Sequence, residues 1–342
     1  MKGTFTFKVD YRNLTFNFKI IRNITILQGD SATGKTTLIN LLAQSLLPKK
    51  RHGISVITNA KYYVYTEKSD RSWKETLENK KEMVIFFEEN NTFIHTHEFA
   101  RYVADSGNYF VFITRDPIKD LPYSTKEIYS IGCHYNGFKH IYIYIYEFNE
   151  VYKNFPYLDN NFDLIITEDS KSGFQFFSKF FCNSKVESAN GASKFITYLD
   201  TLSNSDAHNI LCIADGAAFG CYIRDLVEFS MDNLDKRITI WLPESFEWVL
   251  LKARVISFDS LTQILNNPSE YIECRDYVSW ERFFTYLVEK YSDEKWKYTK
   301  GELDPYYYSE KNKEKIKGTL PKELQNINNT TKDSETKKMS LF

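Results

Sequence analysis

The sequence predicts a two-domain α/β protein whose second domain contains a doubly wound parallel β-sheet. Its 342 residues are enough for two domains of ordinary size. In the first half, a glycine-rich segment joins an apolar strand to an amphipathic helix. In the second half, short apolar strands alternate with amphipathic helices, which is typical of parallel sheets.

The two halves are separated by residues 116–160, where prolines and asparagines interrupt every long hydrophobic period. We therefore expect a first domain at residues 1–158 and a second at residues 159–290. Residues 291–342 are expected to form a C-terminal extension with a polar, disordered tail beyond Leu324.

Charge and cysteine usage exclude several classes of protein. Lys and Arg number 44 and Asp and Glu number 45, so no overall field draws the chain to nucleic acid or anionic lipid. Any such contact must come from a local patch. The 5 cysteines are an odd number, are widely spaced and form no CxxC pair, which argues against a disulfide framework and against a thiolate zinc site.

Hydropathy indicates a protein outside the membrane. No apolar run approaches the roughly 18 residues of a membrane span, and the first residues lack the apolar core of a signal peptide. With the cysteine usage, this favours a soluble, cytoplasmic protein with no membrane partner.

The elements around the glycine-rich segment come in the order strand, loop, helix. Residues 4–20 alternate with period two around a turn, which predicts an antiparallel strand pair, and residues 24–27 read as a buried strand. The helix that follows is expected to carry an apolar face as far as Leu46 and Leu47 and to stop at Pro48.

The segment itself matches GxxxxGK[ST], the P-loop or Walker A motif. Its glycines let backbone N–H groups face phosphate oxygens at a helix N-terminus, where the helix dipole favours anions. Lys35 is expected to contact the β- and γ-phosphates of ATP, and Thr36 to ligate Mg²⁺. The expected nucleotide-binding residues are Gly29, Asp30, Ser31, Ala32, Thr33, Gly34, Lys35, Thr36 and Thr37.

A P-loop needs a nearby acid, and the strand at 83–87 ends in Glu88 and Glu89. This resembles a Walker B strand with Glu in place of Asp. Glu88 is expected to hold the water shell of Mg²⁺ and Glu89 to orient the attacking water, although the assignment within the pair stays open. After the next strand, Arg115 is placed either to sense the γ-phosphate or to act in a neighbour's site; the alternative is a surface residue.

The first half resembles a truncated ABC-type ATPase. The early antiparallel strands are similar to those of that class, whereas the interval from Lys35 to Glu88 is too short for its signature-bearing helical insertion, and no LSGGQ-like string occurs. A nucleotide kinase should show an Arg-rich lid, which the sequence lacks. The resemblance implies an N-terminal P-loop NTPase domain that works as a homo-oligomer.

Acidic residues follow the predicted strands of the second half. Glu168 ends the first strand, Asp215 ends the third, and Glu244 and Glu247 come just after the fourth. In doubly wound sheets ligands sit beyond the carboxyl ends of the strands. One metal site could gather these acids.

This order of elements and acids resembles the Toprim domain, so the second half is identified as a Toprim-like doubly wound parallel α/β domain. Glu168 matches the first glutamate of that domain, Asp215 the first acid of its DxD pair, and Glu247 the later glutamate of OLD-family members. The resemblance implies Mg²⁺, or Mn²⁺ in its place, held by these three carboxylates for phosphodiester cleavage in DNA or RNA.

The sequence departs from the Toprim pattern at Ala217, where the second acid of DxD should stand. Asp169, Glu187 or Glu244 could replace it. Without a replacement, the loss leaves a single-metal site or an inactive one.

The pairing of an ATPase domain with a Toprim-like domain is similar to the overcoming-lysogenization-defect (OLD) family. That family implies a prokaryotic nuclease tied to phage defence, in which nucleotide state governs cutting. The alternative is a nucleotide-dependent switch whose degenerate Toprim-like domain binds or restrains a partner effector.

The C-terminal extension carries two further patterns. The aromatic stretch at 296–308 is expected to cover the sheet, or alternatively to meet nucleic acid. The last four residues, 339–342, resemble the peptide by which bacterial replication proteins bind the sliding clamp, with Lys338 where the usual glutamine stands.

Overall fold

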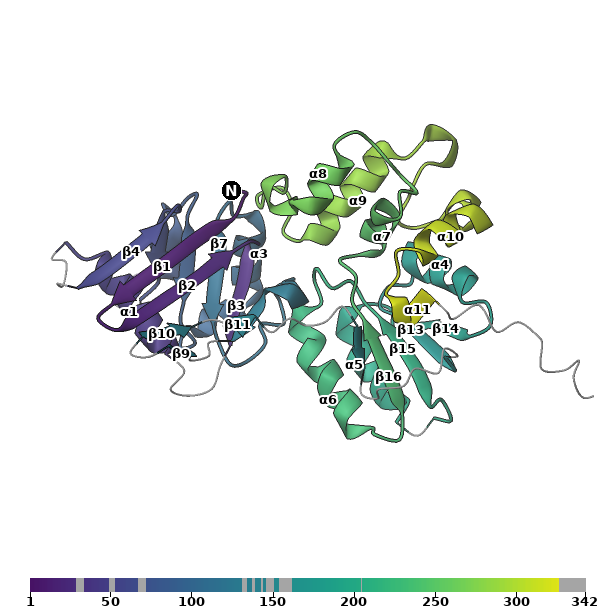
Figure 1. Ribbon diagram of the computed structural model, residues 1–342, viewed down its shortest axis with the longest axis horizontal. Helices are drawn as coiled ribbons and strands as arrows, with labels where there is room; N and C mark the ends of the chain where they lie inside the picture. Colours follow the sequence, from purple (N-terminus) through teal and green to yellow (C-terminus); the bar gives the residue numbers. More distant parts are fainter. Residues whose placement is uncertain are drawn as a thin grey trace, which may run out of the picture. The chain divides into compact units, whose positions relative to one another are not determined.

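The protein forms two compact units, each drawn from separate stretches of the chain (Figure 1). Unit 1 comprises Met1–Phe148, Gly216–Cys221 and Asp259–Phe283, and unit 2 comprises Asn149–Asp215, Tyr222–Phe258 and Phe284–Phe342. The computed structural model describes the following residues of the chain: 1–28, 34–48, 53–66, 72–130, 134–136, 139–142, 144–145, 151–153, 162–203 and 205–325.

Unit 1 contains a mostly antiparallel sheet built on the N-terminal strands. The predicted pair β1 (Phe5–Tyr11) and β2 (Leu14–Ile20) is confirmed, with Phe7 opposite Phe18 in the register. The sheet order is β4-β1-β2-β10-β9. The remaining strands are β4 (Ile54–Thr58), β9 (His134–Asn136) and β10 (Lys139–Tyr142).

The second sheet of unit 1 has the order β11-β8-β3-β7-β6-β5. All its neighbouring pairs from β8 to β5 are parallel, and only β11 runs antiparallel. Strand β7 lies between β3 and β6, so the carboxyl ends of these strands meet at one edge. Its strands are β3 (Ile24–Gln28), β5 (Tyr62–Val64), β6 (Val84–Phe87), β7 (Tyr109–Ile113), β8 (Ile128–Ser130) and β11 (Tyr144–Ile145).

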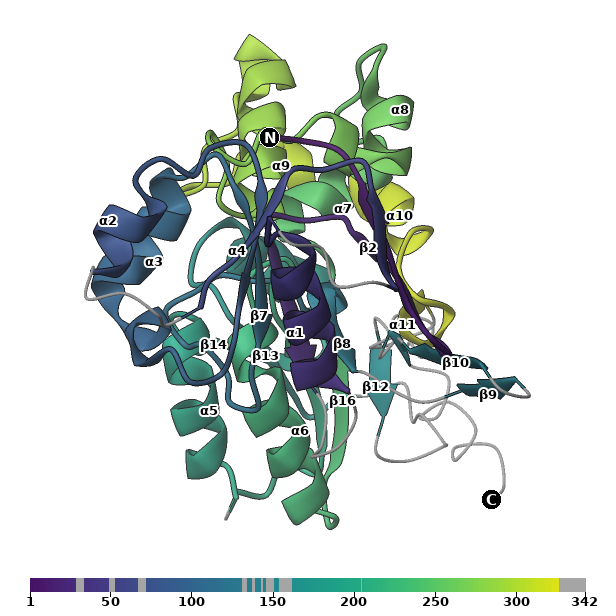
Figure 2. The same cartoon turned by 90° about the vertical axis from the view of Figure 1, so that its left-hand side faces the viewer.

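Helices cover both faces of this parallel sheet (Figure 2). Helix α1 (Lys35–Ser45) lies on the side of the antiparallel sheet, while α2 (Trp73–Leu77) and α3 (His97–Asp105) lie on the other. Unit 1 also contains the short helices η1 (Thr92–His95), η2 (Thr125–Glu127), α8 (Leu261–Asn266) and η4 (Pro268–Glu270).

The expected extent of α1 is wrong by two residues. The helix ends at Ser45, and Leu46 and Leu47 are exposed rather than part of its apolar face. Pro48 explains the difference, because its ring disfavours helical geometry in the residue before it.

Unit 2 is built on a sheet of order β12-β16-β15-β13-β14, parallel except at β12. From β13 the chain passes to β14 on one side and then to β15 on the other, so the strand order reverses between β13 and β15. Its strands are β12 (Val151–Lys153), β13 (Leu164–Thr167), β14 (Lys185–Ser188), β15 (Asn209–Ile213) and β16 (Arg237–Trp241).

The helices of unit 2 alternate with these strands and then continue into the C-terminal extension. Helix α9 (Trp280–Tyr291) begins in unit 1 and ends in unit 2. The short helix η3 (Gly220–Tyr222) likewise begins in unit 1 and ends in unit 2. The others are α4 (Ser172–Phe180), α5 (Ala192–Thr201), α6 (Ile223–Asp232), α7 (Phe246–Lys252), η5 (Glu294–Trp296), η6 (Pro305–Tyr308), α10 (Glu310–Lys317) and α11 (Lys322–Gln325). The mixed α/β class with parallel sheets is therefore confirmed.

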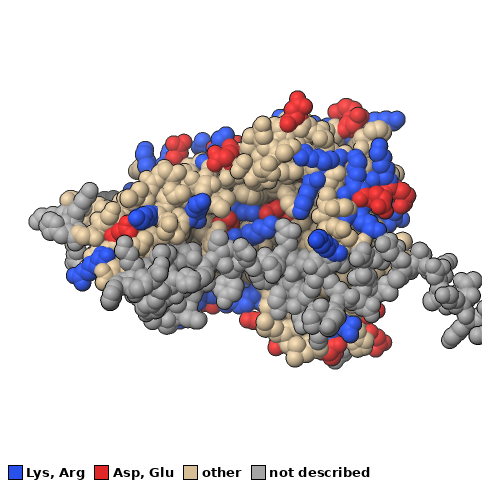
Figure 3. Space-filling view, in the orientation of Figure 1, with Lys and Arg blue, Asp and Glu red and all other residues tan. Residues whose placement is uncertain are grey.

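The surface carries charges of both signs. On the face shown in Figure 3, Lys and Arg side chains lie among Asp and Glu side chains. Among the residues that the structure describes, no helix is long and apolar enough to cross a membrane.

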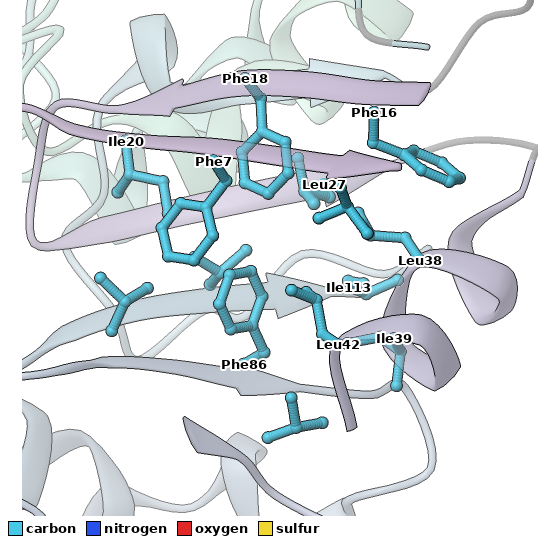
Figure 4. Close-up of a cluster of buried hydrophobic side chains, with 14 of the residues drawn as sticks. Phe7, Phe16, Phe18, Ile20, Leu27, Leu38, Ile39, Leu42, Phe86 and Ile113 are labelled. Carbon is cyan, nitrogen blue, oxygen red and sulfur yellow. The ribbon is translucent and has the colours of Figure 1, made fainter. Parts of the chain in front are cut away.

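The core of unit 1 lies between its two sheets and is closed at one end by α1 (Figure 4). Phe7 of β1 and Phe86 of β6 are fully buried and meet edge to face with ring centroids 5.3 Å apart. The next residue, Phe87, contacts Phe99 of α3 at 5.3 Å. Successive residues of β6 therefore fill opposite sides of the parallel sheet, as the alternation of a strand requires.

Truncating Phe86 tests this packing. The change Phe86→Ala removes a ring that touches both sheets and is expected to lower the free energy of unfolding by about 3–5 kcal/mol. The matched control is Ile57→Ala on β4, whose side chain is 61% exposed and should cost under about 0.5 kcal/mol. Urea unfolding followed by circular dichroism measures both, and equal losses would contradict the packing.

Candidate functional site

The first candidate site lies where β3 meets α1. The structure describes this motif from Gly34 onwards, so the expected contacts of Gly29–Thr33 lie outside the described residues. Gly34 precedes α1 with φ of 98°, a left-handed conformation that glycine adopts without strain. Lys35 is the first residue of α1 and is 8% exposed, whereas Thr36 and Thr37 are exposed.

The start of α1 has the properties of an anion site. The first intrahelical bond runs from the Leu38 N–H to the Gly34 carbonyl oxygen, which leaves the N–H groups of the first turn pointing out of the helix. These N–H groups, the helix dipole and the Lys35 ammonium all favour negative charge at the same end.

The expected acids stand at the same edge of the sheet. Glu88 and Glu89 are half-buried just after β6, and Arg115 follows β7, which lies between β6 and β3. The Arg115 guanidinium is 3.6 Å from a Glu89 carboxylate oxygen. The parallel strand order thus collects Lys35, Glu88, Glu89 and Arg115 at one edge.

The Glu89–Arg115 pair is weak enough to rearrange. The two side chains are 37% and 56% exposed, so solvent screens their attraction. Exposed ion pairs contribute about 0–1 kcal/mol.

The second candidate site lies in unit 2, where the strand order reverses between β13 and β15. Glu168 follows β13 and Asp215 follows β15, so the two acids come from neighbouring parallel strands. The Asp215 N–H donates to Glu168 Oε2 at 3.0 Å, and the Glu168 N–H donates to the Ile213 carbonyl at 2.9 Å. These bonds hold the two acids side by side.

A small cavity opens at this point and is lined by Glu168, Asp169 and Asp215 together with backbone and apolar groups. Its volume is about 10 Å³, which is close to the room that a single water molecule needs. The cavity has room for about one water molecule.

The Asp169 carboxylate is hydrogen-bonded to backbone N–H groups at the start of α4. It accepts N–H groups from Lys171 (3.2 Å), Gly173 (3.2 Å) and Phe174 (3.0 Å). Gly173 is needed here, because a Cβ at that position would lie 2.8 Å from Asp169 Oδ1. Burial raises the pKa of Asp169, although these N–H groups oppose the shift.

Glu247 does not line this cavity. It sits in the first turn of α7 and is 1% exposed, and its Oε1 accepts the Tyr298 hydroxyl at 2.7 Å. Among the described residues Oε2 has no hydrogen-bond partner, and Lys300 Nζ lies 3.9 Å from Oε1. The structure thus brings Glu168 and Asp215 together, while Glu247 is buried against Tyr298 and its negative charge contributes to the raised pKa of Asp169.

The other acids that could replace the missing ligand either have partners of their own or do not line the cavity. Glu187 lies on the edge strand β14, where it pairs with Lys185 and accepts the Tyr198 hydroxyl. Glu244 is buried and is absent from the cavity wall. Ala217 stands where the Toprim pattern has its second acid. It is buried and belongs to unit 1.

Metal binding fits this site only in part. Carboxylate oxygens are the ligands that Mg²⁺ and Mn²⁺ prefer. However, within the described ranges no three His, Cys, Asp or Glu side chains are grouped so as to hold an ion. An ion here would have to recruit Glu168 and Asp215 by side-chain rotation.

Tyr298 is a site residue that the sequence pattern did not single out. Its hydroxyl bridges Glu247 and Ser172, and the tyrosine is 2% exposed. Burial, followed by the negative charge of Glu247, raises the pKa of Tyr298 well above its usual value, so it stays a donor. These bonds place Tyr298 of the aromatic stretch against α4 and α7, whereas the sequence pattern predicts that the stretch covers the sheet.

Comparison with models of known protein families gives no match, and a search of curated proteins finds none similar to this chain. The resemblance to the OLD family and its implied activities therefore stay predictions. The clamp-binding interpretation concerns residues 339–342, which lie outside the described residues.

Removing the Tyr298 hydroxyl tests how Glu247 is held. Tyr298→Phe leaves the buried Oε1 without its hydroxyl donor and is expected to lower the free energy of unfolding by about 1–3 kcal/mol. The matched control is Tyr271→Phe, since that hydroxyl is exposed and makes a long 3.4 Å contact with Gln263. Chemical denaturation of both variants gives the comparison, and an unchanged Tyr298→Phe protein would show that Glu247 does not depend on this bond.

Proposed function

We propose that the protein is a P-loop nucleoside triphosphatase that uses ATP with Mg²⁺. The observation that carries this proposal is the strand order β3-β7-β6, which puts the first turn of α1 at the same edge as Glu88, Glu89 and Arg115. The GxxxxGK[ST] motif between β3 and α1 adds the glycines and lysine that a triphosphate needs.

Each residue at this edge has a separate task. Lys35 and the N–H groups of α1 hold phosphate oxygens, and the exposed Thr36 hydroxyl, with Glu88, would hold Mg²⁺. Bound Mg²⁺ supplies charge neutralisation on the phosphate oxygens. Glu89 orients the attacking water once Arg115 has turned from Glu89 to the γ-phosphate, either in its own subunit or in that of a neighbour.

Substituting Lys35 tests the nucleotide site. Lys35→Ala is expected to lower the rate of ATP hydrolysis at least about 100-fold, because it removes the cation that offsets phosphate charge. Glu89→Gln should retain ATP binding and lose turnover to a similar degree. Lys8→Ala, an exposed lysine of β1, is the control. Phosphate release reports all three, and full activity of Lys35→Ala would refute the site.

We propose further that unit 2 is a Toprim-like domain in which Glu168 and Asp215 support metal-dependent cleavage of DNA or RNA. Support comes from the position of both acids where the strand order reverses, which is where ligands bind in such sheets. A divalent cation held by Glu168 and Asp215 would activate water and offset charge on a phosphodiester. The wider role in phage defence rests on the OLD-family resemblance.

Strand breaks decide whether this second site is active. With plasmid DNA or RNA, ATP and Mg²⁺ or Mn²⁺, the wild-type protein is expected to cut and Asp215→Asn to lose cutting while it still hydrolyses ATP. Asp235→Asn, an exposed acid between α6 and β16, is the matched control. Cutting that persists in Asp215→Asn, or that survives a chelator, would contradict the assignment.

A second function is favoured by three observations: buried Ala217, Glu247 covered by Tyr298, and the lack of three grouped acids among the described residues. In this alternative the protein is a nucleotide-dependent switch whose unit 2 binds or restrains a partner effector. ATP hydrolysis without any strand breaks would support it. Transfer of phosphate to a small acceptor would instead identify a nucleotide kinase.

A further inference from the structure

Strand β4 ends the antiparallel sheet of unit 1 (Figure 1). On one side it pairs with β1 in an unbroken antiparallel register, in which Val56 lies opposite Val9. Within the described ranges, no strand pairs with its other side. We call this outer side of Ile54–Thr58 the β4 edge. Since a strand directs N–H and C=O groups to both sides, the β4 edge offers backbone donors and acceptors to a partner.

The β4 edge differs from the other strands that end a sheet. Among the strands that the structure describes, β5, β9 and β12 have three residues each, β11 has two and β14 has four. Strand β14 also carries the charged pair Lys185 and Glu187. Strand β4 has five residues, none of them charged and none proline, and no bulge interrupts its register. Proteins protect exposed edges by shortening them or with charges, prolines and bulges, so this edge lacks the usual protection against strand pairing.

The side chains of β4 also favour strand pairing. All its residues except Ser55 are β-branched. Ile57 is 61% exposed, although its side chain is large and apolar. Helix α1 packs against β4, and Leu46 and Leu47, which directly follow this helix, are exposed as well. An exposed, uncharged and apolar strand edge is an expected site of pairing with another chain.

The pattern of β4 is complementary to itself. Its first, third and fifth residues are half-buried on one face, and Ser55 and Ile57 are exposed on the other. In an antiparallel pair of two β4 strands centred on Val56, this residue lies opposite Val56 of the partner subunit, and Ser55 lies opposite Ile57 of the partner subunit. Opposed residues of such a pair share one face of the sheet, so exposed residues meet exposed ones. This centre also pairs all the residues of both strands.

A second copy of the chain is therefore the occupant that fits this edge. A pair that uses the same surface on both copies has two-fold symmetry and closes as a dimer. Main-chain hydrogen bonds of an added strand supply affinity, and the side chains on alternate faces fix the register.

We propose that two copies of this chain form a dimer through the β4 edge, in which their antiparallel sheets join into one continuous sheet. Backbone hydrogen bonds between the two β4 strands hold the dimer, and Ile57 of each copy packs against Ser55 of the partner subunit. The inference does not depend on the proposed nucleotide or nuclease functions.

Light scattering after size-exclusion chromatography tests the dimer in the full chain, with no nucleotide added. The wild-type protein is expected to have twice the 40.3 kDa mass of the single chain. Ile57→Lys brings like charges together across the pair and is expected to raise the dissociation constant of the dimer at least about tenfold. Leu234→Lys is the matched control, because Leu234 is an apolar residue of unit 2 with 66% exposure, and this variant should stay dimeric.

Circular dichroism of both lysine variants shows whether they are folded, which we expect because both side chains are exposed. A wild-type protein that is monomeric at every concentration would overturn the proposal. So would a folded Ile57→Lys protein that dimerises as tightly as the wild type.

Disulfide cross-linking tests the register, in a background in which Cys133 and the exposed Cys182 are replaced by serine. Val56→Cys is expected to form cross-linked dimers under mild oxidation, because the two opposed Cβ atoms lie near the separation that a disulfide spans. Ser55→Cys and Ile57→Cys are expected to cross-link only when one chain carries both. Cross-linking of either single variant as complete as that of the double variant would contradict a pair centred on Val56.

Discussion

Parallel pairing of β3, β7 and β6 is the constraint on which the rest of the structure depends. In a parallel sheet every carboxyl end points to one edge, so residues distant in sequence become neighbours there without any contact designed between them. The register Leu27 to Ile113 and Phe87 to Phe112 brings the carboxyl ends of the three strands to the same level. This alignment is the reason that Lys35, Glu88 and Arg115 lie at the same edge of the sheet.

The same rule gives unit 2 its acid pair, but burial changes what those acids can do. A carboxylate that is partly or fully buried needs partners, and here the protein supplies them itself: backbone N–H groups for the half-buried Glu168 and Asp169, and a phenol for the buried Glu247. A divalent cation would compete with these donors rather than fill an empty, prepared cage. Whether a cation can displace these donors decides between an active one-ion site and an inactive site that serves only in signalling.

The periodic patterns predicted the strands and helices well, because alternation and amphipathic faces are local signals. The β1–β2 pair and the strands before Glu88, Glu168 and Asp215 follow from them. They could not predict that Gly216–Cys221 and Asp259–Phe283 join unit 1, since such docking depends on contacts far apart in sequence. Tyr298 was missed for the same reason, because its partner Glu247 is distant in the chain. The sequence showed only that Tyr298 lies in an aromatic stretch.

A structure determined with a non-hydrolysable ATP analogue and Mg²⁺ would test the central claim most directly. The account predicts triphosphate density against the N-terminus of α1, in contact with Lys35 and facing Glu88, with Arg115 no longer paired with Glu89. Density for the analogue anywhere else, or none at saturating concentration, would contradict it.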